Sequence, residues 1–490
     1  MRVRLVLAVV VAVTAVGCAA KRVQPIPRTS TAPSTAAAAP RVDVDALIRR
    51  GCFRCFEQAL AAAQANGDRQ QAFEAAALMV LRAKDLGLPL SERIETMRTL
   101  MPDESGWDVL LGIVLVMPGD PLSGERYREA SLAAFDQRRR VQVSLDTWRA
   151  ALAEPPGSPL FRAFLDLSLT CTFPSRDQTS ADVAARALDR WPNVPMIAFR
   201  AATCSQDRAS LLPTFRAADP EFLDAEYFQG RLAATSVVPD LDEALGHLAA
   251  AHDAFPESAA ITTTLGDVRI QREEWAEALE QYDAVLERMP VHRDALLGRT
   301  ISLSRLRRHE EGIAAATRMI DLGEWRLGEA YYWRAWNKFE LRRLDDAAAD
   351  RDGAKTLMSN PALYVLSGLI EWGQRHLPPA EEEFQRALTL DFGQCDAALY
   401  LGGVRFERKE RPESVAAFKQ AVQCYDLSIG LRRKMIDDVR AGGGSEAGKA
   451  RAIAGHERAI AEATAQREQA ARDAATVEKT LSSRNRADPP

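Results

Sequence analysis

The sequence is poor in aromatic residues and histidines, and its charges nearly balance. Aromatic residues make up 7% of the 490 residues, and the six histidines are scattered along the chain. Zinc-binding helices carry two histidines at a fixed spacing, and the stretch "HEEGI" at His309 lacks the second one. The formal net charge of −5 provides no basic patch of the kind that binds nucleic acid. These absences predict no metal site and no nucleic-acid partner.

Motifs for catalysis are also absent. The stretch "GGSEAGKA" has the spacing of a phosphate-binding loop from Gly443 to Lys449, but Ala450 replaces the metal-binding hydroxyl that such a loop requires. A nucleophile elbow of the G-x-S-x-G type does not occur. We therefore expect no cofactor, and we do not expect an enzyme.

Long apolar runs are missing except at the N-terminus. There the basic start "MRVR" precedes the apolar run "LVLAVVVAVTAV". This run is too short for a membrane-spanning helix, which needs about 20 residues. This pattern predicts a signal peptide over residues 1–17. The overlapping "AVGC" resembles the lipobox of bacterial lipoproteins, and the resemblance implies that Cys18 is acylated and becomes the mature N-terminus. An ordinary signal peptide with a chance cysteine is the alternative.

Residues 18–43 contain little that a folded core could bury. After Cys18 the segment "AAKRVQPIPRTSTAPSTAAAAPRVD" consists mostly of Ala, Pro, Ser and Thr, a composition typical of a flexible tether. Ala19 stands where lipoproteins retained at the inner membrane carry aspartate. The resemblance therefore implies a lipid-anchored protein of the cell envelope, at the outer membrane and facing the periplasm.

A repeat of about 34 residues occupies the second half of the chain. A small residue follows a short acidic or proline-led turn at Ala244, Ala278, Gly312, Ala347, Ala380 and Ser414. A second column of small residues contains Gly266, Thr300, Ala335, Gly368 and Gly402, and a bulky column contains Tyr282, Phe384 and Phe418. This spacing predicts one helix pair per repeat, with the small residues where the helices cross and the bulky ones filling the gap between pairs.

The repeat resembles the tetratricopeptide repeat (TPR) family over residues 222–425. The resemblance implies an all-α, right-handed superhelical solenoid of antiparallel helix pairs. One departure is Arg351, which occupies the column of Tyr282 and Phe384. Residues 44–221 have helical patterns that we interpret as degenerate repeats of the same superhelix.

Residues 426–490 form a separate C-terminal region. A glycine-rich hinge, "AGGGS", precedes an alanine-rich segment that predicts one long helix, and the last residues are expected to be a disordered tail. Ile453, Ile460, Ala474 and Leu481 follow a seven-residue step that Arg467 interrupts. We expect this helix to cap the solenoid, and a coiled-coil dimer is the alternative.

Six cysteines remain besides Cys18, an even number in a chain that is expected to be exported. In antiparallel helix pairs, Cys395 at the start of one helix and Cys424 at the end of the next meet at one end, which predicts a disulfide. Cys171 and Cys204 lie about one repeat apart, which favours neighbouring helices. The remaining pair, Cys52 and Cys55, is a C-x-x-C motif. We interpret it as a structural bridge or as buried thiols, with a redox-active pair as the alternative.

The concave face of the TPR family implies the place of partner binding. The family's pattern selects Thr263, Asp267, Leu297, Arg305, Tyr332, Trp336, Phe339, Val365, Trp372, Leu399 and Phe406. We predict a partner-binding groove at the aromatic members Tyr332, Trp336, Phe339, Trp372 and Phe406, and packing of these rings on each other or on the C-terminal helix is the alternative. Family members that grip a chaperone tail use a specific asparagine with basic residues, and its absence here disfavours that ligand. The matching column reads Asp267, Ile301, Trp336, Leu369 and Gly403.

Together these features predict a membrane-anchored TPR scaffold for protein–protein interaction. Its partners would be other proteins of the cell envelope, in an assembly, secretion or pilus-type complex. A glycan-binding or polysaccharide-export module is the second hypothesis, because a row of aromatic rings also stacks on sugars. An enzyme is the third.

Overall fold

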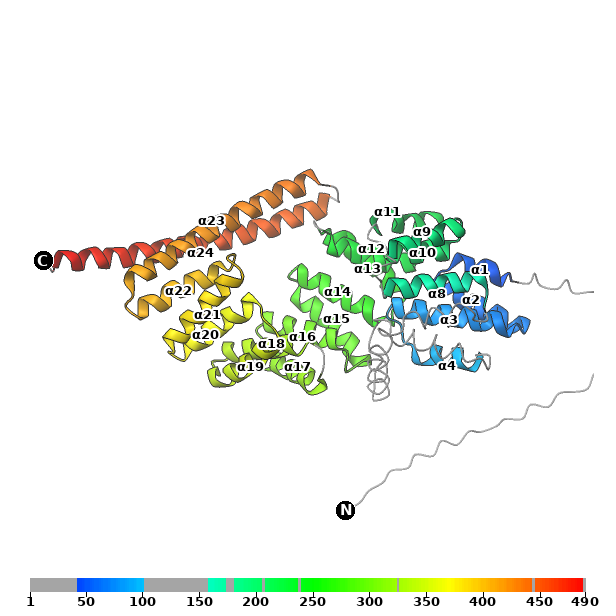
Figure 1. Cartoon of the computed structure of the whole chain (residues 1–490), viewed down its shortest axis with the longest axis horizontal. Helices are drawn as coiled ribbons and strands as arrows, with labels where there is room; N and C mark the ends of the chain where they lie inside the picture. The colour runs from blue at the N-terminus through cyan, green and yellow to red at the C-terminus, as the bar shows by residue number, and fades with distance from the viewer. Residues whose placement is uncertain are drawn as a thin grey trace, which may run out of the picture. The chain divides into compact units, whose positions relative to one another are not determined.

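A computed structural model of the chain describes residues 42–100, 157–172, 180–204, 208–236, 239–323, 326–442 and 446–487. The predicted signal peptide, Cys18 and the tether lie outside these residues. Every regular element among the described residues is an α-helix (Figure 1). The prediction of an all-α fold is therefore confirmed. No helix in the described part of the chain has both the length and the hydropathy needed to cross a membrane.

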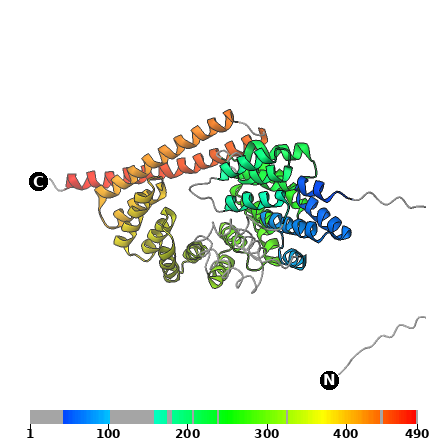
Figure 2. The same ribbon diagram turned by 45° about the vertical axis from the view of Figure 1, so that its right-hand side comes forward.

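Residues 224–424 form a row of helix pairs that follow one another in sequence order (Figures 1 and 2). Apart from α23, these helices have 12 to 14 residues each. The pairs are α12 (Asp224–Thr235) with α13 (Leu241–Ala254), α14 (Ala259–Gln271) with α15 (Trp275–Arg288), α16 (Arg293–Arg305) with α17 (His309–Leu322), α18 (Leu327–Glu340) with α19 (Leu344–Leu357), α20 (Pro361–Gly373) with α21 (Leu377–Leu390), and α22 (Cys395–Glu407) with α23 (Arg411–Ala441). This is the predicted solenoid of helix pairs.

Glycines opposite large side chains hold the two helices of a pair close together. A Cβ on Gly368 would lie 2.5 Å from the ring of Phe384, and a Cβ on Gly402 would lie 2.5 Å from the ring of Phe418. No side chain fits at these glycines without a shift, so the close crossing depends on them. The predicted packing of small against bulky residues is confirmed at both pairs.

A sixth member of this column, Gly230, escaped the sequence analysis. A Cβ on Gly230 would lie 2.6 Å from Leu248 Cγ, so the pair of α12 and α13 uses the same contact. Gly230 lies 36 residues before Gly266 because the turn between α12 and α13 is longer than in the later repeats. Because of the longer turn, Gly230 does not follow the 34-residue spacing from which the other members of the column were identified.

The turns inside the pairs contain charged residues in a left-handed conformation. Their φ angles lie between 59° and 68° at Arg307, Glu273, Arg342, Arg375 and Lys409. This conformation costs a residue with a Cβ about 1–2 kcal/mol. Four of the five are cations that follow the C-terminus of the first helix, where the helix dipole favours positive charge and offsets part of that cost.

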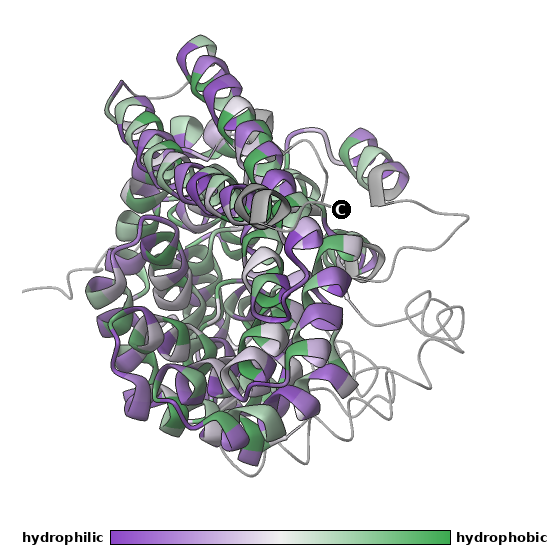
Figure 3. Cartoon of the chain, turned by 90° about the vertical axis from the view of Figure 1, so that its left-hand side faces the viewer, coloured by the Kyte–Doolittle hydropathy of each residue, from purple (hydrophilic) through white to green (hydrophobic). Residues whose placement is uncertain are grey.

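The N-terminal helices pack around a central helix. The bounds are α1 (Val44–Arg50), α2 (Phe53–Asn66), α3 (Arg69–Asp85), α4 (Ser91–Leu100), α8 (Pro159–Thr172), α9 (Ser180–Arg190), α10 (Pro195–Cys204) and α11 (Arg208–Ala218). In α3 every residue from Ala72 to Lys84 is buried, so neighbours cover this helix on all sides. Its core continues into Leu248 and Ile261 of the helix-pair row. In the later helix pairs, which face the viewer in Figure 3, hydrophobic positions lie mostly between the helices and hydrophilic ones mostly on the outside.

The C-terminal helices form a long hairpin. α23 has 31 residues, against 14 in α21, and α24 (Glu446–Ala487) runs back along it (Figure 1). Ala470 of α24 packs on Tyr425, and Ala474 and Val477 pack on Phe418. The helix therefore covers the last repeat of its own chain, as expected for a cap. Its first turns also reach α13, where Arg451 pairs with Asp242.

One disulfide closes the end of the row. The bond between Cys395 and Cys424 joins the first residue of α22 to α23, 29 residues later. This is the pairing that antiparallel helices predict. The side chains of Cys171 and Cys204 lie outside the described residues, and their pairing stays a prediction.

Candidate functional site

The first helices of the pairs form one continuous surface, which we call the inner face. Each of α12, α14, α16, α18 and α20 packs directly against the next first helix in the row, whereas the second helices of neighbouring pairs are farther apart. A row that is closer on one side bends toward that side. The predicted groove residues all belong to these first helices.

Three of the predicted groove residues lie together on α18. Tyr332, Trp336 and Phe339 are half-buried, and they pack against Leu366 and Ile370 of the next first helix, α20. The ring centroids of Trp336 and Phe339 are 6.4 Å apart. Burial raises the pKa of the Tyr332 hydroxyl, and the charge of Arg305 opposes this shift. The α18 rings are thus held in place on one side and open on the other.

The other two predicted groove residues do not join this group. Trp372 packs on Tyr400, with ring centroids 6.3 Å apart, and its Nε1 donates a hydrogen bond of 3.0 Å to Glu407 Oε1. A Cβ on Gly403 would lie 2.7 Å from the Trp372 ring, so the indole rests on the backbone of α22. Phe406 is 43% exposed. The alternative of rings packing on each other thus describes Trp372 better than it describes the α18 rings.

Carboxylates flank the aromatic residues of α18, and the sequence analysis did not single them out. Glu329 lies seven residues before Trp336 and Glu340 lies four residues after it, so the three share one helix face. Both carboxylates are half-buried and neither forms an ion pair with another described residue. Most acidic residues on a helix simply face solvent, so the sequence alone does not mark Glu329 and Glu340. Only their position beside the rings distinguishes these two.

A third carboxylate, Asp267 of α14, is open to solvent on the same inner face. It accepts a hydrogen bond of 2.7 Å from the hydroxyl of the buried Tyr282. Although part of the side chain is exposed, the protein around the carboxylate desolvates it and raises its pKa to about 6, while the Tyr282 hydrogen bond opposes the shift. The charge of Asp294 raises this pKa further, and Arg326 and His292 lower it. The desolvation therefore outweighs the hydrogen bond and the nearby cations.

An exposed cation of the inner face, Arg305 of α16, is already engaged by aromatic rings. Its guanidinium lies 5.7 Å from the ring centroid of Trp275 and 5.8 Å from that of Trp333. Such cation–π contacts fix the side chain between two neighbouring repeats. Arg305 is thus a bridge within the solenoid, and it leaves the carboxylates near it unpaired.

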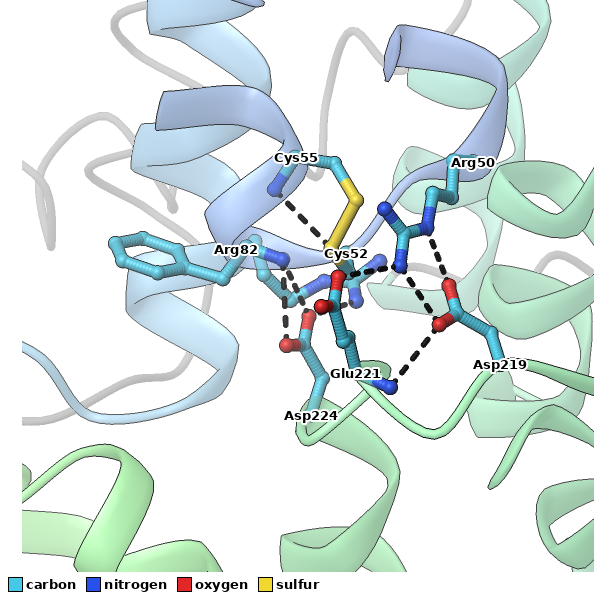
Figure 4. The surroundings of a disulfide bond; sticks show 8 residues. Arg50, Cys52, Cys55, Arg82, Asp219, Glu221 and Asp224 are labelled. Atoms are coloured by element: carbon cyan, nitrogen blue, oxygen red, sulfur yellow. Dashed lines mark hydrogen bonds and ion pairs between the residues drawn. A yellow bond between two sulfur atoms is a disulfide. The ribbon is translucent and has the colours of Figure 1, made fainter. Parts of the chain in front are cut away.

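The C-x-x-C motif forms a second candidate site, shown in Figure 4. Cys52 and Cys55 are joined in a disulfide, and Cys52 caps the N-terminus of α2 through a hydrogen bond from the Cys55 N–H to its Sγ. Both are buried, with exposures of 2% and 1%. Redox-active cysteines need access to a partner thiol, so this environment supports the structural bridge over the redox-active pair.

A buried ion pair lies beside this disulfide. Arg82 Nη1 of α3 contacts Asp224 Oδ2 of α12 at 2.6 Å, and the Phe53 N–H donates to the same carboxylate at 2.9 Å (Figure 4). Burial raises the pKa of Asp224 and lowers that of Arg82, and the attraction between the two opposes both shifts. The Arg82 guanidinium also lies 4.3 Å from the ring centroid of Phe199. These contacts join α2, α3, α10 and α12.

The described part of the chain contains no evident metal-binding site. No three His, Cys, Asp or Glu side chains there gather closely enough to hold a metal ion. The described residues therefore add no metal site to the inner face or to the surroundings of the disulfide.

Comparisons with known proteins find TPR proteins among the solved structures that this chain partly resembles. No protein-family model and no curated protein matches the sequence. Among solved structures, a TPR protein from Parabacteroides merdae is 13% identical and covers 60% of this chain and 99% of its own, with a TM-score of 0.38. MamA from Desulfovibrio magneticus RS-1 is 16% identical and covers 34% and 94%, with a TM-score of 0.31. The TPR protein TTC0263 from Thermus thermophilus is 16% identical and covers 38% and 99%, with a TM-score of 0.32. The TPR-type fold rests on this chain's own helix pairs.

Proposed function

We propose that this protein is a lipid-anchored TPR scaffold of the bacterial cell envelope that binds partner proteins on its inner face. The observation that carries the proposal is the group of half-buried rings on α18, Tyr332, Trp336 and Phe339, which neighbouring helices hold in place. Large, rigid aromatic side chains are the usual anchors of protein interfaces. A groove of stacked helices presents such anchors to an extended or helical segment of a partner.

The anchor is the second part of the proposal. The apolar run of residues 5–16 and Cys18 support lipidation, and residues 18–43 would tether the helical part to the outer membrane on its periplasmic side. A scaffold held near the membrane in this way would serve an assembly, secretion or pilus-type complex.

Replacing Cys18 with serine is expected to release the protein from membranes, because serine cannot carry the thioether-linked lipid. Fractionation of cells into membrane and soluble material measures this, and mass spectrometry of the N-terminus shows whether the signal peptide is removed after residue 17. If the variant stays in the membrane fraction with a normal mature N-terminus, the protein is not a lipoprotein.

Replacing Trp336 with alanine is expected to weaken binding of a partner protein by about 2 kcal/mol or more, as for an interface hot spot. Because the indole is only half-buried, the loss of folding stability should be smaller than the cost of truncating a buried ring, about 3–5 kcal/mol. A pull-down from detergent-solubilised envelope and thermal melting of the same variant give both quantities.

A matched control is Trp191→Ala, which removes a half-buried indole in the turn between α9 and α10. It should leave partner recovery unchanged. A Trp336→Ala variant that melts far below the wild type but recovers partners normally would make Trp336 a core residue and contradict the proposal. Recovery of peptidoglycan in place of proteins would favour the glycan-binding hypothesis.

A further inference from the structure

The inner face combines aromatic rings with carboxylates that lack partners. On α18, Glu329 and Glu340 lie on either side of Tyr332 and Trp336, and neither forms an ion pair with a described residue. The two carboxylates are eleven residues apart, or about 16 Å along the helix axis. Their position places two negative charges without a counter-charge directly beside apolar rings.

Two further observations come from α14. Asp267 is exposed on the inner face, with the Tyr282 hydroxyl as its hydrogen-bond donor. One turn earlier on the same helix face, the hydroxyl of Thr263 is buried and has no hydrogen-bond partner among the described residues, and its side chain is only 6% exposed. A buried acceptor that is left unsatisfied costs about 1–3 kcal/mol unless a bound donor reaches it.

The arginines near these acids are engaged by other groups. Arg305 faces the rings of Trp275 and Trp333. Arg342 lies over the ring of Phe339, and Arg326 lies 3.6 Å from Asp294. The inner face between α14 and α18 therefore presents negative charge and apolar rings together. A complementary ligand must bring both a positive charge and an apolar side chain.

We propose that the inner face selects partner segments in which lysine or arginine residues flank an aromatic or aliphatic residue. The apolar side chain packs on Trp336 and Tyr332, and the cations reach Glu329 and Glu340. An extended segment covers the distance between the two carboxylates in about five residues. This inference rests on the proposed protein-binding function and adds the chemical class of the bound segment.

The test is selection from a phage-displayed library of short random peptides, panned against the full chain in detergent solution. We expect the enriched peptides to carry Lys or Arg on both sides of an apolar residue. A synthetic peptide of the enriched sequence should bind the Glu329→Gln/Glu340→Gln variant about tenfold or more weakly, and Asp267→Asn should weaken it to a smaller extent. Added salt should weaken binding to the wild type and should hardly affect the double variant.

The matched control is Glu280→Gln on α15, which removes an exposed carboxylate from a second helix and should leave peptide binding unchanged. Enrichment of neutral or acidic peptides whose binding depends on Trp336 would overturn the inference and leave the proposed function standing. If the wild type enriches no peptide reproducibly, or if Trp336→Ala binds the enriched peptides as well as the wild type does, both are overturned.

Discussion

Replacing Asp224 with alanine is expected to destabilise the N-terminal helices by about 3–5 kcal/mol, the cost of leaving one partner of a buried ion pair alone. Arg82 is fully buried, and Asp224 is its closest counter-charge, at 2.6 Å. The variant also leaves the Phe53 N–H at the start of α2 without its acceptor. The buried guanidinium would keep only the more distant Asp85, 3.9 Å away, and the amide would be left unpaired beside it.

The measurement must be local, because a row of repeats does not unfold as a single unit. Hydrogen exchange followed in α2 and α3 reports the opening of these helices directly. The control is Asp219→Ala, which breaks a partly exposed ion pair with Arg50 and should cost about 1 kcal/mol or less. Replacing both members of the buried pair by apolar residues should restore much of the loss. Equal protection of α2 in Asp224→Ala and in the wild type would show that the pair contributes little.

This ion pair shows what the sequence could not reveal. Arg82 and Asp224 are separated by 142 residues, and nothing in the composition around either one distinguishes it from a surface charge. Their contact depends on how α3 and α12 pack, and α3 lies outside the 34-residue repeat. Where no periodic pattern exists, a buried charge cannot be told from a solvated one before the packing is known.

Residues within the repeat were predictable, because each position recurs in the same environment. The glycines at 368 and 402 and the rings of Phe384 and Phe418 meet as the spacing predicts. The pairing of Cys395 with Cys424 follows from the same antiparallel geometry. The family pattern also selected the inner-face positions of Tyr332 and Trp336, although their role in binding stays a prediction.

Residues whose role depends on their particular neighbours were missed or could not be interpreted. Glu329 and Glu340 escaped the sequence analysis because they matter only beside the half-buried rings of their own helix. Arg305 was selected for the inner face, but its contacts with Trp275 and Trp333 of the neighbouring repeats could not be predicted. Arg351 breaks the bulky column, and the structure shows that it replaces packing with ion pairs to Asp352 and Glu371. A repeated column shows which positions are equivalent. When one of them carries a residue of different chemistry, its role can be understood only from the residues that surround it.

Replacing Gly298 with alanine is expected to destabilise the solenoid by about 1–3 kcal/mol through overpacking, although alanine is the better helix former. The ring of Tyr282 is fully buried between Gly266 of α14 and Gly298 of α16. A Cβ on Gly266 would lie 2.7 Å from Tyr282 Cζ, and a Cβ on Gly298 would lie closer still. Tyr282→Ala should itself cost about 3–5 kcal/mol, because it empties this site and removes the hydrogen bond to Asp267.

Combining Gly298→Ala with Tyr282→Ala separates the steric clash of a Cβ at position 298 with the Tyr282 ring from any other effect of the glycine substitution. In the Tyr282→Ala background the ring is gone, so Gly298→Ala should become stabilising by up to about 1 kcal/mol through helix propensity alone. Gly246→Ala on α13 is the matched control, because a Cβ there meets nothing within 4 Å, and it should stabilise the protein in either background. Urea unfolding followed by hydrogen exchange in α14 to α16 measures each variant. If Gly298→Ala is equally destabilising with and without the Tyr282 ring, a steric clash with that ring is not the reason for glycine at this position. The packing of the ring between two glycines would then not explain how neighbouring repeats stay close.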